Sequence, residues 1–484
     1  MITESVNSIL KSIFRITMEK THHIAILPSP GMGHLIPMAE FAKRLVKHHP
    51  ISVTLIIPTT GTPPNAQISV LESLPDNIHH LFLPSVNIEG LPEGARPEIL
   101  ISFIMQASLS GLRDALSSLK SRTNLVALVF DMFGHDSMEV AKEFNLFKFL
   151  FFPMNAMALS FTFILPKLDE ETSCEYKDLP YPVNVPGSVS FPGRDLMAPV
   201  QIRTDEVYKG YLLLSKRLTL LDGIMVNSFE ELEEETFRVL RTGAAGQSQT
   251  PIYPIGPLIQ SDSDNGLDRH ECLKWLDNQQ DGSVVLVSFG SGGTLSLDQI
   301  HELAIGLEMS GHKFLWILRS PDEKASNASF FTASSQTDPL GFLPEGFLAR
   351  TAKRGFIVRS WAPQIDILSH KATGGFLTHC GWNSTLESVV HGVPMIAWPL
   401  YAEQHMNAKV MTEALCLALR AETDDNGMVR KEVIEKVVKE LMDGDEGKKI
   451  SKRLKELKDD AIKALSDGGS SMDALSKFAQ QLMK

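Results

Sequence analysis

The chain has 484 residues, which is too long for one ordinary hydrophobic core and predicts about two to three domains. A composition that is 43% hydrophobic and 21% charged excludes a mainly disordered, collagen-like or coiled-coil protein. The formal net charge of −12 argues against nucleic acid as a partner, because a protein that binds a phosphate backbone needs a basic surface.

Residues 1–20 form an N-terminal extension that we expect to be disordered. The alternative is a short amphipathic helix lying on a membrane surface. The segment lacks the apolar run and the cleavage site of a secretory signal, so we expect a cytoplasmic protein. The cysteines agree with a reducing compartment, since they are scattered and lack the spacing of a zinc site; they are Cys174, Cys272, Cys380 and Cys416.

Apolar runs of strand length alternate with segments of helical period in both halves of the chain. This pattern predicts an α/β fold with two doubly wound, Rossmann-like domains, each built on a parallel sheet with crossover helices. In the first half, strands are expected at 23–28, 52–58, 125–131 and 147–153, with helices at 35–48 and 138–144. In the second half, strands are expected at 283–291, 313–319, 355–361, 373–379 and 393–399, with helices at 297–309, 385–391 and within 429–484.

The uncharged stretch 149–166 approaches the length of a membrane span. Pro153, Asn155, Ser160 and Thr162 interrupt it, and a buried strand followed by a buried helix accounts for the same residues. We therefore interpret it as core and expect no stable membrane insertion.

Prolines and polar residues replace the periodic pattern at 251–268, which predicts an interdomain linker. The two domains are expected at 21–250 and 269–460, and the C-terminal helices at 461–484 can pack back on the first domain. Ligands of doubly wound sheets bind at the carboxyl ends of the strands, so we expect the chemistry there, in a cleft between the domains.

His34 and Asp131 are the first candidate catalytic residues. His34 follows the first strand after a glycine-rich turn, and Asp131 ends the strand at 125–131, where a carboxylate can orient an imidazole that acts as a general base. The alternatives are a histidine that only binds its own loop and an aspartate that caps the next helix. A dinucleotide-binding dehydrogenase is disfavoured, because Ile36 replaces the third glycine of the fingerprint.

Residues 361–404 carry the most specific pattern in the chain. A strand delivers His379, and residues 381–384 then open a helix whose unpaired N–H groups and positive dipole end suit a phosphate. Glu387 lies one turn further on, where its carboxylate can accept two hydrogen bonds from a vicinal diol. The flat indole of Trp361 suits a nucleobase. Together these groups predict a site for a nucleoside diphosphate joined to a sugar.

This segment resembles the signature box of plant family 1 UDP-glycosyltransferases. The motifs PSPGMGHLIP at 28–37, VFD at 129–131 and VLVSFGS at 285–291 resemble family motifs in the same order, and the resemblance runs from about residue 21 to the end of the chain. It implies the GT-B fold, with an acceptor-binding domain at 21–250 and a UDP-sugar-binding domain at 269–460.

The resemblance also implies a role for each matched residue. His34 is the base that deprotonates the acceptor, and Asp131 balances its charge. The donor-binding residues implied are Ser291, Trp361, Ala362, Gln364, His379, Trp382, Asn383, Ser384, Glu387, Glu403 and Gln404. The acceptor-binding residues implied are Phe133, Phe151, Met154 and Asn155, together with the loop after Leu81.

The reaction implied is an inverting transfer from UDP-glucose, because a Gln at position 404 accompanies glucose in this family. No cofactor or metal is expected, and we interpret the Asp262-Ser263-Asp264 sequence in the linker as solvated charge. The acceptor implied is a small phenol such as hydroquinone or a monolignol, and the protein is expected to be a monomer. The alternatives are flavonoids or other plant secondary metabolites as acceptors, or a nucleotide-sugar-binding protein without turnover.

Overall fold

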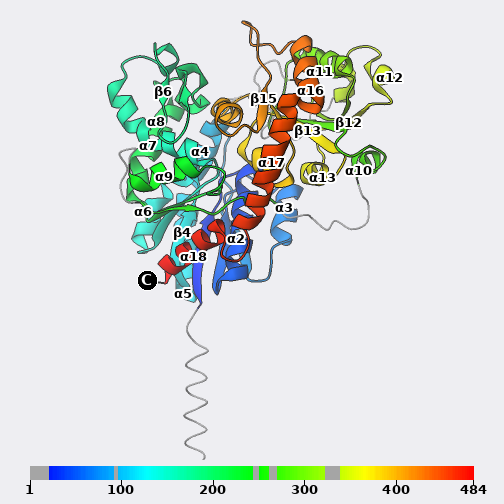
Figure 1. The fold of residues 1–484 in the computed structure, drawn as a ribbon. Helices are drawn as coiled ribbons and strands as arrows, with labels where there is room; N and C mark the ends of the chain where they lie inside the picture. The colour runs from blue at the N-terminus through cyan, green and yellow to red at the C-terminus, as the bar shows by residue number, and fades with distance from the viewer. Residues whose placement is uncertain (1–20, 92–95, 244–249, 261–269, 322–337, 484) are drawn as a thin grey trace, which may run out of the picture. The chain divides into compact units, whose positions relative to one another are not determined.

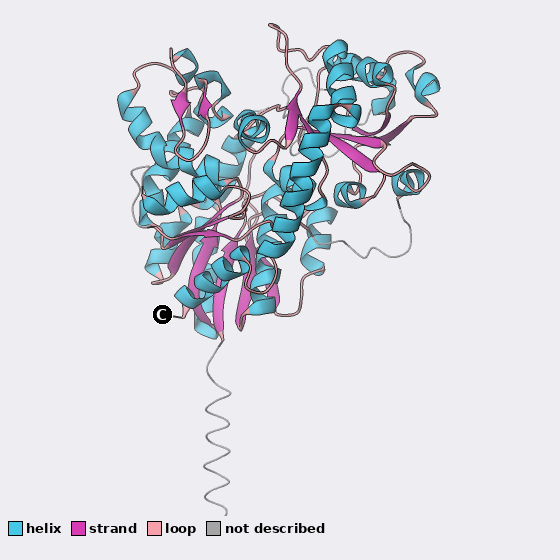
Figure 2. Cartoon of the chain, in the orientation of Figure 1, coloured by secondary structure: helices cyan, strands magenta, loops and turns pink. Residues whose placement is uncertain are grey.

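The computed structural model describes residues 21–91, 96–243, 250–260, 270–321 and 338–483. The predictions for 1–20 and for Asp262–Asp264 lie outside these residues, and the predicted linker at 251–268 lies only partly inside them. Two parallel sheets flanked by helices carry the fold (Figures 1 and 2), and a small antiparallel pair is formed by β6 (Val183–Asn184) and β7 (Ser190–Phe191).

The first sheet has seven strands in the order β3-β2-β1-β4-β5-β8-β9. Its strands are β1 (His22–Leu27), β2 (Ile51–Ile57), β3 (Ile78–Phe82), β4 (Asn124–Phe130), β5 (Phe147–Phe152), β8 (Gly223–Val226) and β9 (Ile252–Pro254). Its helices are α2 (Met32–His48), α3 (Asn65–Glu72), α4 (Pro97–Ala107), α5 (Leu109–Arg122), α6 (Ser137–Glu143), α7 (Ala156–Glu171), α8 (Glu206–Arg217) and α9 (Glu234–Thr242). The strand order reverses between β1 and β4, which pair in parallel.

The second sheet has six strands in the order β12-β11-β10-β13-β14-β15, and it reverses between β10 and β13. Its strands are β10 (Val284–Ser288), β11 (Lys313–Leu318), β12 (Gly355–Arg359), β13 (Thr373–Thr378), β14 (Met395–Ala397) and β15 (Ala418–Arg420). The helices of this half are α10 (Glu271–Leu276), α11 (Leu297–Ser310), α12 (Phe347–Thr351), α13 (Gln364–Ser369), α14 (Trp382–His391), α15 (Gln404–Lys409), α16 (Lys431–Asp443), α17 (Asp445–Ala464) and α18 (Ser470–Leu482).

Short helical turns complete the described secondary structure. They are η1 (Met132–Gly134), η2 (Tyr176–Asp178), η3 (Gly193–Asp195), η4 (Ala198–Val200), η5 (Leu218–Leu220), η6 (Pro339–Phe342) and η7 (Val410–Ala414). The α/β prediction is confirmed, because every strand predicted from an apolar run is a strand of one of the two parallel sheets. The stretch 149–166 is also core, as predicted: it comprises the end of β5 and most of α7, and Phe149, Phe151 and Phe161 are fully buried.

No single helix among the described residues has the length and hydropathy of a membrane span. The helices α4 and α5, which are bent relative to each other, have that length and hydropathy only when they are counted together as one segment.

The structure corrects the sequence analysis at β9. The residues Ile252–Pro254 were assigned to the linker at 251–268, but they pair with β8 and form the last strand of the first sheet. Two prolines in a short segment hide the strand pattern, and such residues are tolerated at the edge of a sheet, where one side of the backbone has no partner strand.

The described chain divides into two compact units whose limits differ from the predicted domain boundaries. Unit 1 comprises Met1–Glu89, Ser102–Leu150 and Ser476–Lys484, and unit 2 comprises Gly90–Ile101 and Phe151–Leu475. Residues 151–250 therefore cluster with the C-terminal half of the sequence. Hydrogen bonds within unit 2 explain this grouping: the indole N–H of Trp382 donates to the carbonyl of Asn227 at 2.6 Å, and Ala198 N–H donates to the carbonyl of Ala402 at 2.8 Å.

The last turns of α18 belong to unit 1. The buried ring of Phe478 packs edge-on against Phe149, with ring centroids 4.8 Å apart, and against Phe41 of α2 at 5.6 Å. Both partners are fully buried, so the C-terminal segment contributes to the core beneath the first sheet.

We predict that Phe478→Ala destabilises unit 1 by about 3–5 kcal/mol, because it leaves a cavity between α2 and β5. Hydrogen exchange of β1 and α2 should then become faster. Met483→Ala is the matched control, since Met483 is 48% exposed and its replacement should change stability by less than about 0.5 kcal/mol. Equal exchange rates in the two variants would contradict this account.

Candidate active site

The residues predicted to be catalytic lie at the point where the first sheet reverses its order. The chain leaves β1 through Ser29, turns at Gly31 and enters α2, whose first turn carries His34. Gly31 has φ 119°, a conformation that residues with a side chain rarely adopt. Asp131 directly follows β4, the neighbour of β1. Since parallel strands end at the same edge, the fold brings the imidazole and the carboxylate together.

Asp131 is fully buried and accepts four hydrogen bonds. The Nδ1 atom of His34 lies 2.9 Å from its Oδ2. The Ser29 N–H donates to the same oxygen at 2.8 Å, and the Phe133 N–H donates to Oδ1 at 3.1 Å. The Ser29 hydroxyl also donates to Oδ1. Asp131 thus caps η1, which agrees with the alternative interpretation of this residue as a helix cap, and it also orients His34. The contribution of Ser29 was not recognised from the sequence.

The ionisation of Asp131 follows from these contacts. Burial opposes the charged form, but the electrostatic interaction and hydrogen bond with His34 and the hydrogen bonds from Ser29 outweigh it and hold the pKa of Asp131 below its usual value. An ionised carboxylate is only an acceptor, so His34 carries its proton on Nδ1. The other ring nitrogen, Nε2, is then the basic atom, and the His34 side chain is 14% exposed.

The predicted acceptor residues differ in how the structure places them. Phe133 lies edge-on to His34, with ring centroids 5.6 Å apart. Phe151 and Asn155 are fully buried, and Met154 is 7% exposed. Asn155 caps α7, because its Oδ1 accepts from the Ala158 N–H at 2.8 Å. Its acceptor role, like those of Phe151 and Met154, stays a prediction.

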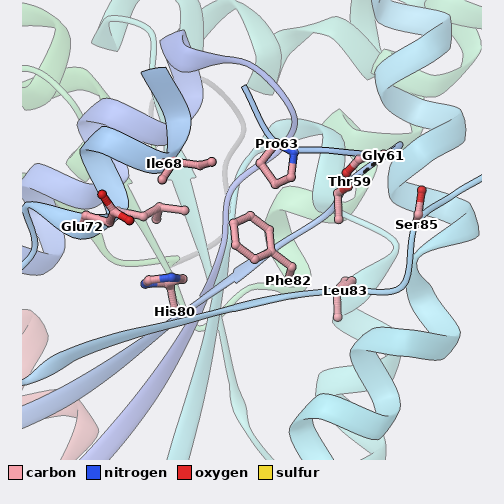
Figure 3. Close-up of a pocket in the computed structure, with 10 residues that line it drawn as sticks. Thr59, Gly61, Pro63, Ile68, Glu72, His80, Phe82, Leu83 and Ser85 are labelled. Carbon is pink, nitrogen blue, oxygen red and sulfur yellow. Dashed lines mark hydrogen bonds between the residues drawn. The ribbon is translucent and has the colours of Figure 1, made fainter. Parts of the chain in front are cut away.

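Unit 1 also contains a cavity of about 450 Å³ beside the carboxyl ends of β2 and β3 (Figure 3). This volume is in the range of ordinary ligand pockets. Side chains of α3 and the ring of Phe82 line it, together with Leu83 and Ser85 from the loop after Leu81. The loop that the sequence assigned to acceptor binding therefore borders a cavity at the same sheet edge that carries His34.

Several of the predicted donor-binding residues join in one network near the end of β10, where the second sheet reverses its order. Gln364, the first residue of α13, is the centre of a hydrogen-bond network: its Oε1 accepts from the Ser288 hydroxyl at 2.9 Å. Its Nε2 donates to Ser384 Oγ at 2.9 Å and to Glu387 Oε2 at 2.7 Å. Ser288 ends β10, and Ser384 and Glu387 lie on α14, so three elements fix one constellation. Desolvation raises the pKa of Glu387 to about 7, against the opposing effect of Gln364.

His379 lies directly after β13, in front of α14. Burial lowers its pKa to about 4, so the imidazole is neutral at physiological pH, and its Nδ1 is a buried atom with no hydrogen-bond partner in the described structure. Glycines flank the ring: a Cβ at Gly290 or Gly381 would lie 2.6 or 2.4 Å from it. Gly381 is the N-cap residue of α14 and makes no side-chain hydrogen bond to the helix. The first backbone N–H groups of α14 are therefore available to a ligand.

The remaining residues of the box occupy the same half. Trp361 is 70% exposed, as an indole that stacks on a base must be, whereas Ala362 is buried and Ser291 is exposed. Trp382 is buried and donates to the Asn227 carbonyl, so its side chain serves the protein's own structure. Asn383 lies in the first turn of α14.

Two residues predicted to face the sugar lie at the start of α15. Gln404 Oε1 accepts from the Leu400 and Tyr401 N–H groups, both at 2.9 Å. Because both bonds use the carbonyl oxygen, the amide can offer a ligand only its Nε2 hydrogens. Glu403 is the N-cap residue of α15 and accepts from Asn407 Nδ2 at 3.2 Å.

Comparison with known proteins shows which family the chain belongs to. The family model described as UDP-glucoronosyl and UDP-glucosyl transferase matches residues 261–467. Hydroquinone glucosyltransferase of Rauvolfia serpentina is 52% identical over 96% of this chain and 98% of its own. UDP-glycosyltransferase 72B1 of Arabidopsis thaliana is 50% identical over 95% of this chain and 96% of its own.

The chain belongs to the UDP-glycosyltransferase family. A structure of Phytolacca americana UGT2 complexed with UDP-2fluoro-glucose and pterostilbene matches it with a TM-score of 0.87 at 48% identity, over 96% of this chain and 99% of that one. The predicted GT-B fold and transferase class are thereby confirmed. The dehydrogenase and the binding protein without turnover are set aside.

We predict that His34→Ala lowers turnover by about 10²–10⁴-fold and leaves UDP affinity nearly unchanged, because it removes the base but no donor contact. Product formation and UDP titration measure the two effects. His48→Ala, at the exposed C-terminal end of the same helix, is the control and should behave as wild type. Full turnover in His34→Ala would remove this residue from the base role.

The raised pKa of Glu387 predicts a pH dependence of uridine binding. In the predicted role the ionised carboxylate accepts hydrogen bonds from the ribose hydroxyls, and this form is lost as the pH falls through about 7. The Kd for uridine should therefore rise by up to about tenfold between about pH 8 and about pH 6. Uridine is used in place of UDP because it carries no phosphate group that would itself titrate in this pH range. In Glu387→Gln the affinity should be lower and independent of pH; a pH-independent wild type would contradict the assignment.

Proposed function

We propose that the enzyme transfers glucose from UDP-glucose to the hydroxyl group of small phenols and forms β-O-glucosides with inversion at the anomeric carbon. The observation that carries this proposal is the 2.9 Å contact between His34 Nδ1 and the buried, ionised Asp131. It directs Nε2 of His34 to take the proton of an acceptor hydroxyl, and Asp131 stabilises the imidazolium that results.

The donor half supplies the complementary chemistry. The diphosphate gains negative charge as the glycosidic bond breaks, and the N-terminus of α14, Ser384 and the neutral His379 can donate hydrogen bonds to it. We therefore propose that the reaction needs no metal or other cofactor. The glucose preference rests on Gln404, whose Nε2 hydrogens can bond to sugar hydroxyl oxygens, and on Glu403 beside it. A single in-line displacement of UDP inverts the α-linked donor.

A small phenol is the acceptor class that we propose. Phe133 packs beside His34, so an aromatic ring can lie against it while its hydroxyl group meets the imidazole. The relative from Rauvolfia serpentina acts on hydroquinone by name, and the Phytolacca americana structure contains pterostilbene. Hydroquinone and monolignols are therefore the first acceptors to test, followed by flavonoids and other plant secondary metabolites.

We also propose that the protein works as a cytoplasmic monomer. Its four cysteines are free thiols, as expected in a reducing compartment. Size-exclusion chromatography with light scattering tests the monomer, and fractionation of cells tests the compartment.

The proposal predicts that the protein with UDP-glucose and hydroquinone or coniferyl alcohol releases UDP and forms a glucoside, detected by mass. NMR of the product should show a β-linked glucose. Chelation by EDTA should change the rate by less than about twofold, since the charge on the leaving group is stabilised by α14. Hydrolysis without a glucoside, an α-linked product or a loss of activity in EDTA would each overturn part of the proposal.

A further inference from the structure

A buried chain of asparagine side chains links α7 to the sugar end of the donor site. Asn155 and Asn407 are both fully buried, with 0% solvent exposure, and they are 252 residues apart in sequence. Asn155 Nδ2 donates to Asn407 Oδ1 at 2.9 Å. Asn407 Nδ2 in turn donates to the Cys380 carbonyl at 2.9 Å and to Glu403 Oε1 at 3.2 Å.

The direction of these hydrogen bonds is fixed at Asn155. Asn155 Oδ1 accepts from the Ala158 N–H at the beginning of α7, so its Nδ2 must be the group that faces Asn407. Asn407 must then present its oxygen to Asn155 and both Nδ2 hydrogens to Cys380 and Glu403. Turning the Asn407 amide over would set its oxygen against a carbonyl and a carboxylate, which are both acceptors.

Both acceptors of Asn407 belong to the donor site. Cys380 has φ 66°, which is unfavourable for a residue with a side chain, and its carbonyl is part of the peptide plane that leads into Gly381, the N-cap of α14. Holding that carbonyl fixes the plane at the anion-binding end of α14. Holding one carboxylate oxygen of Glu403 fixes the direction in which this group meets a sugar.

We propose that Asn407 is a positioning residue for the hexose of the donor, and that Asn155 sets the orientation of its amide. This inference rests on the proposed function, in which Glu403 faces the sugar. It assigns Asn155 to donor geometry, through Asn407, in place of the acceptor contact that the family resemblance implies.

Asn407→Asp tests the proposal, because it keeps the size of the side chain and removes both Nδ2 donors. The expected result is a ratio of the Kd for UDP-glucose to the Kd for UDP that rises about tenfold, since only the hexose needs Glu403. In a Glu403→Ala background the same change should leave the ratio unaltered within about twofold. Asn278→Asp, at an exposed asparagine just after α10 that donates to the Lys274 carbonyl, is the matched control.

Asn155→Asp keeps the proposal testable if Asn407→Asp does not fold. The aspartate still accepts the Ala158 N–H and caps α7, but it cannot donate to Asn407. The Kd ratio should rise by about two- to fivefold while the KM for the phenol stays unchanged. A lower melting temperature with an unchanged ratio, or a higher phenol KM with an unchanged ratio, would overturn the inference. Absence of glucosyl transfer by the wild type would instead reject the proposed function.

Discussion

The buried charge of Asp131 is the constraint on which the acceptor half of the site depends. A carboxylate removed from water is stable only when its oxygens are hydrogen-bonded, and Ser29, His34 and Phe133 supply those bonds from the turn after β1, from α2 and from η1. The groups that stabilise the charge are therefore the groups that hold His34, the proposed base. Local stability and the orientation of Nε2 of His34 follow from one network, so neither can be changed alone.

The predicted donor half is also organised around one hydrogen-bonded side chain, but here that side chain is the neutral amide of Gln364. Gln364 has both a donor and an acceptor, and it joins Ser288, Ser384 and Glu387 across β10 and α14. In both sheets, polar residues of these networks lie at the ends of strands where the strand order reverses: Asp131 follows β4, and Ser288 ends β10. Parallel strands leave this edge open because neighbouring crossover helices depart to opposite faces. The two half-sites thus have a common topological origin.

The sequence predicts most of this because the features concerned are local. Apolar runs indicate the buried strands, and the motifs around His34 and His379 lie within a few residues of strand ends. It does not predict β9, which lies between Pro251 and Pro257 and ends on Pro254, or the grouping of 151–250 with the C-terminal half. The hydrogen bond between Asn155 and Asn407 is not predicted from the sequence either, because a contact between residues 252 positions apart leaves no periodic pattern. Ser29 stands beside a recognised motif, but its role depends on Asp131, which is distant in sequence.

The glycines on either side of His379 have a consequence for changing this protein by design. Gly290 and Gly381 come from different strand ends, and each leaves space that the imidazole fills. An added methyl group at either position would displace the ring, so a random library that varies both segments would lose most members before any altered sugar preference could be selected. Variation aimed at new donors is better directed to the start of α15, where Glu403 and Gln404 are the residues proposed to face the sugar.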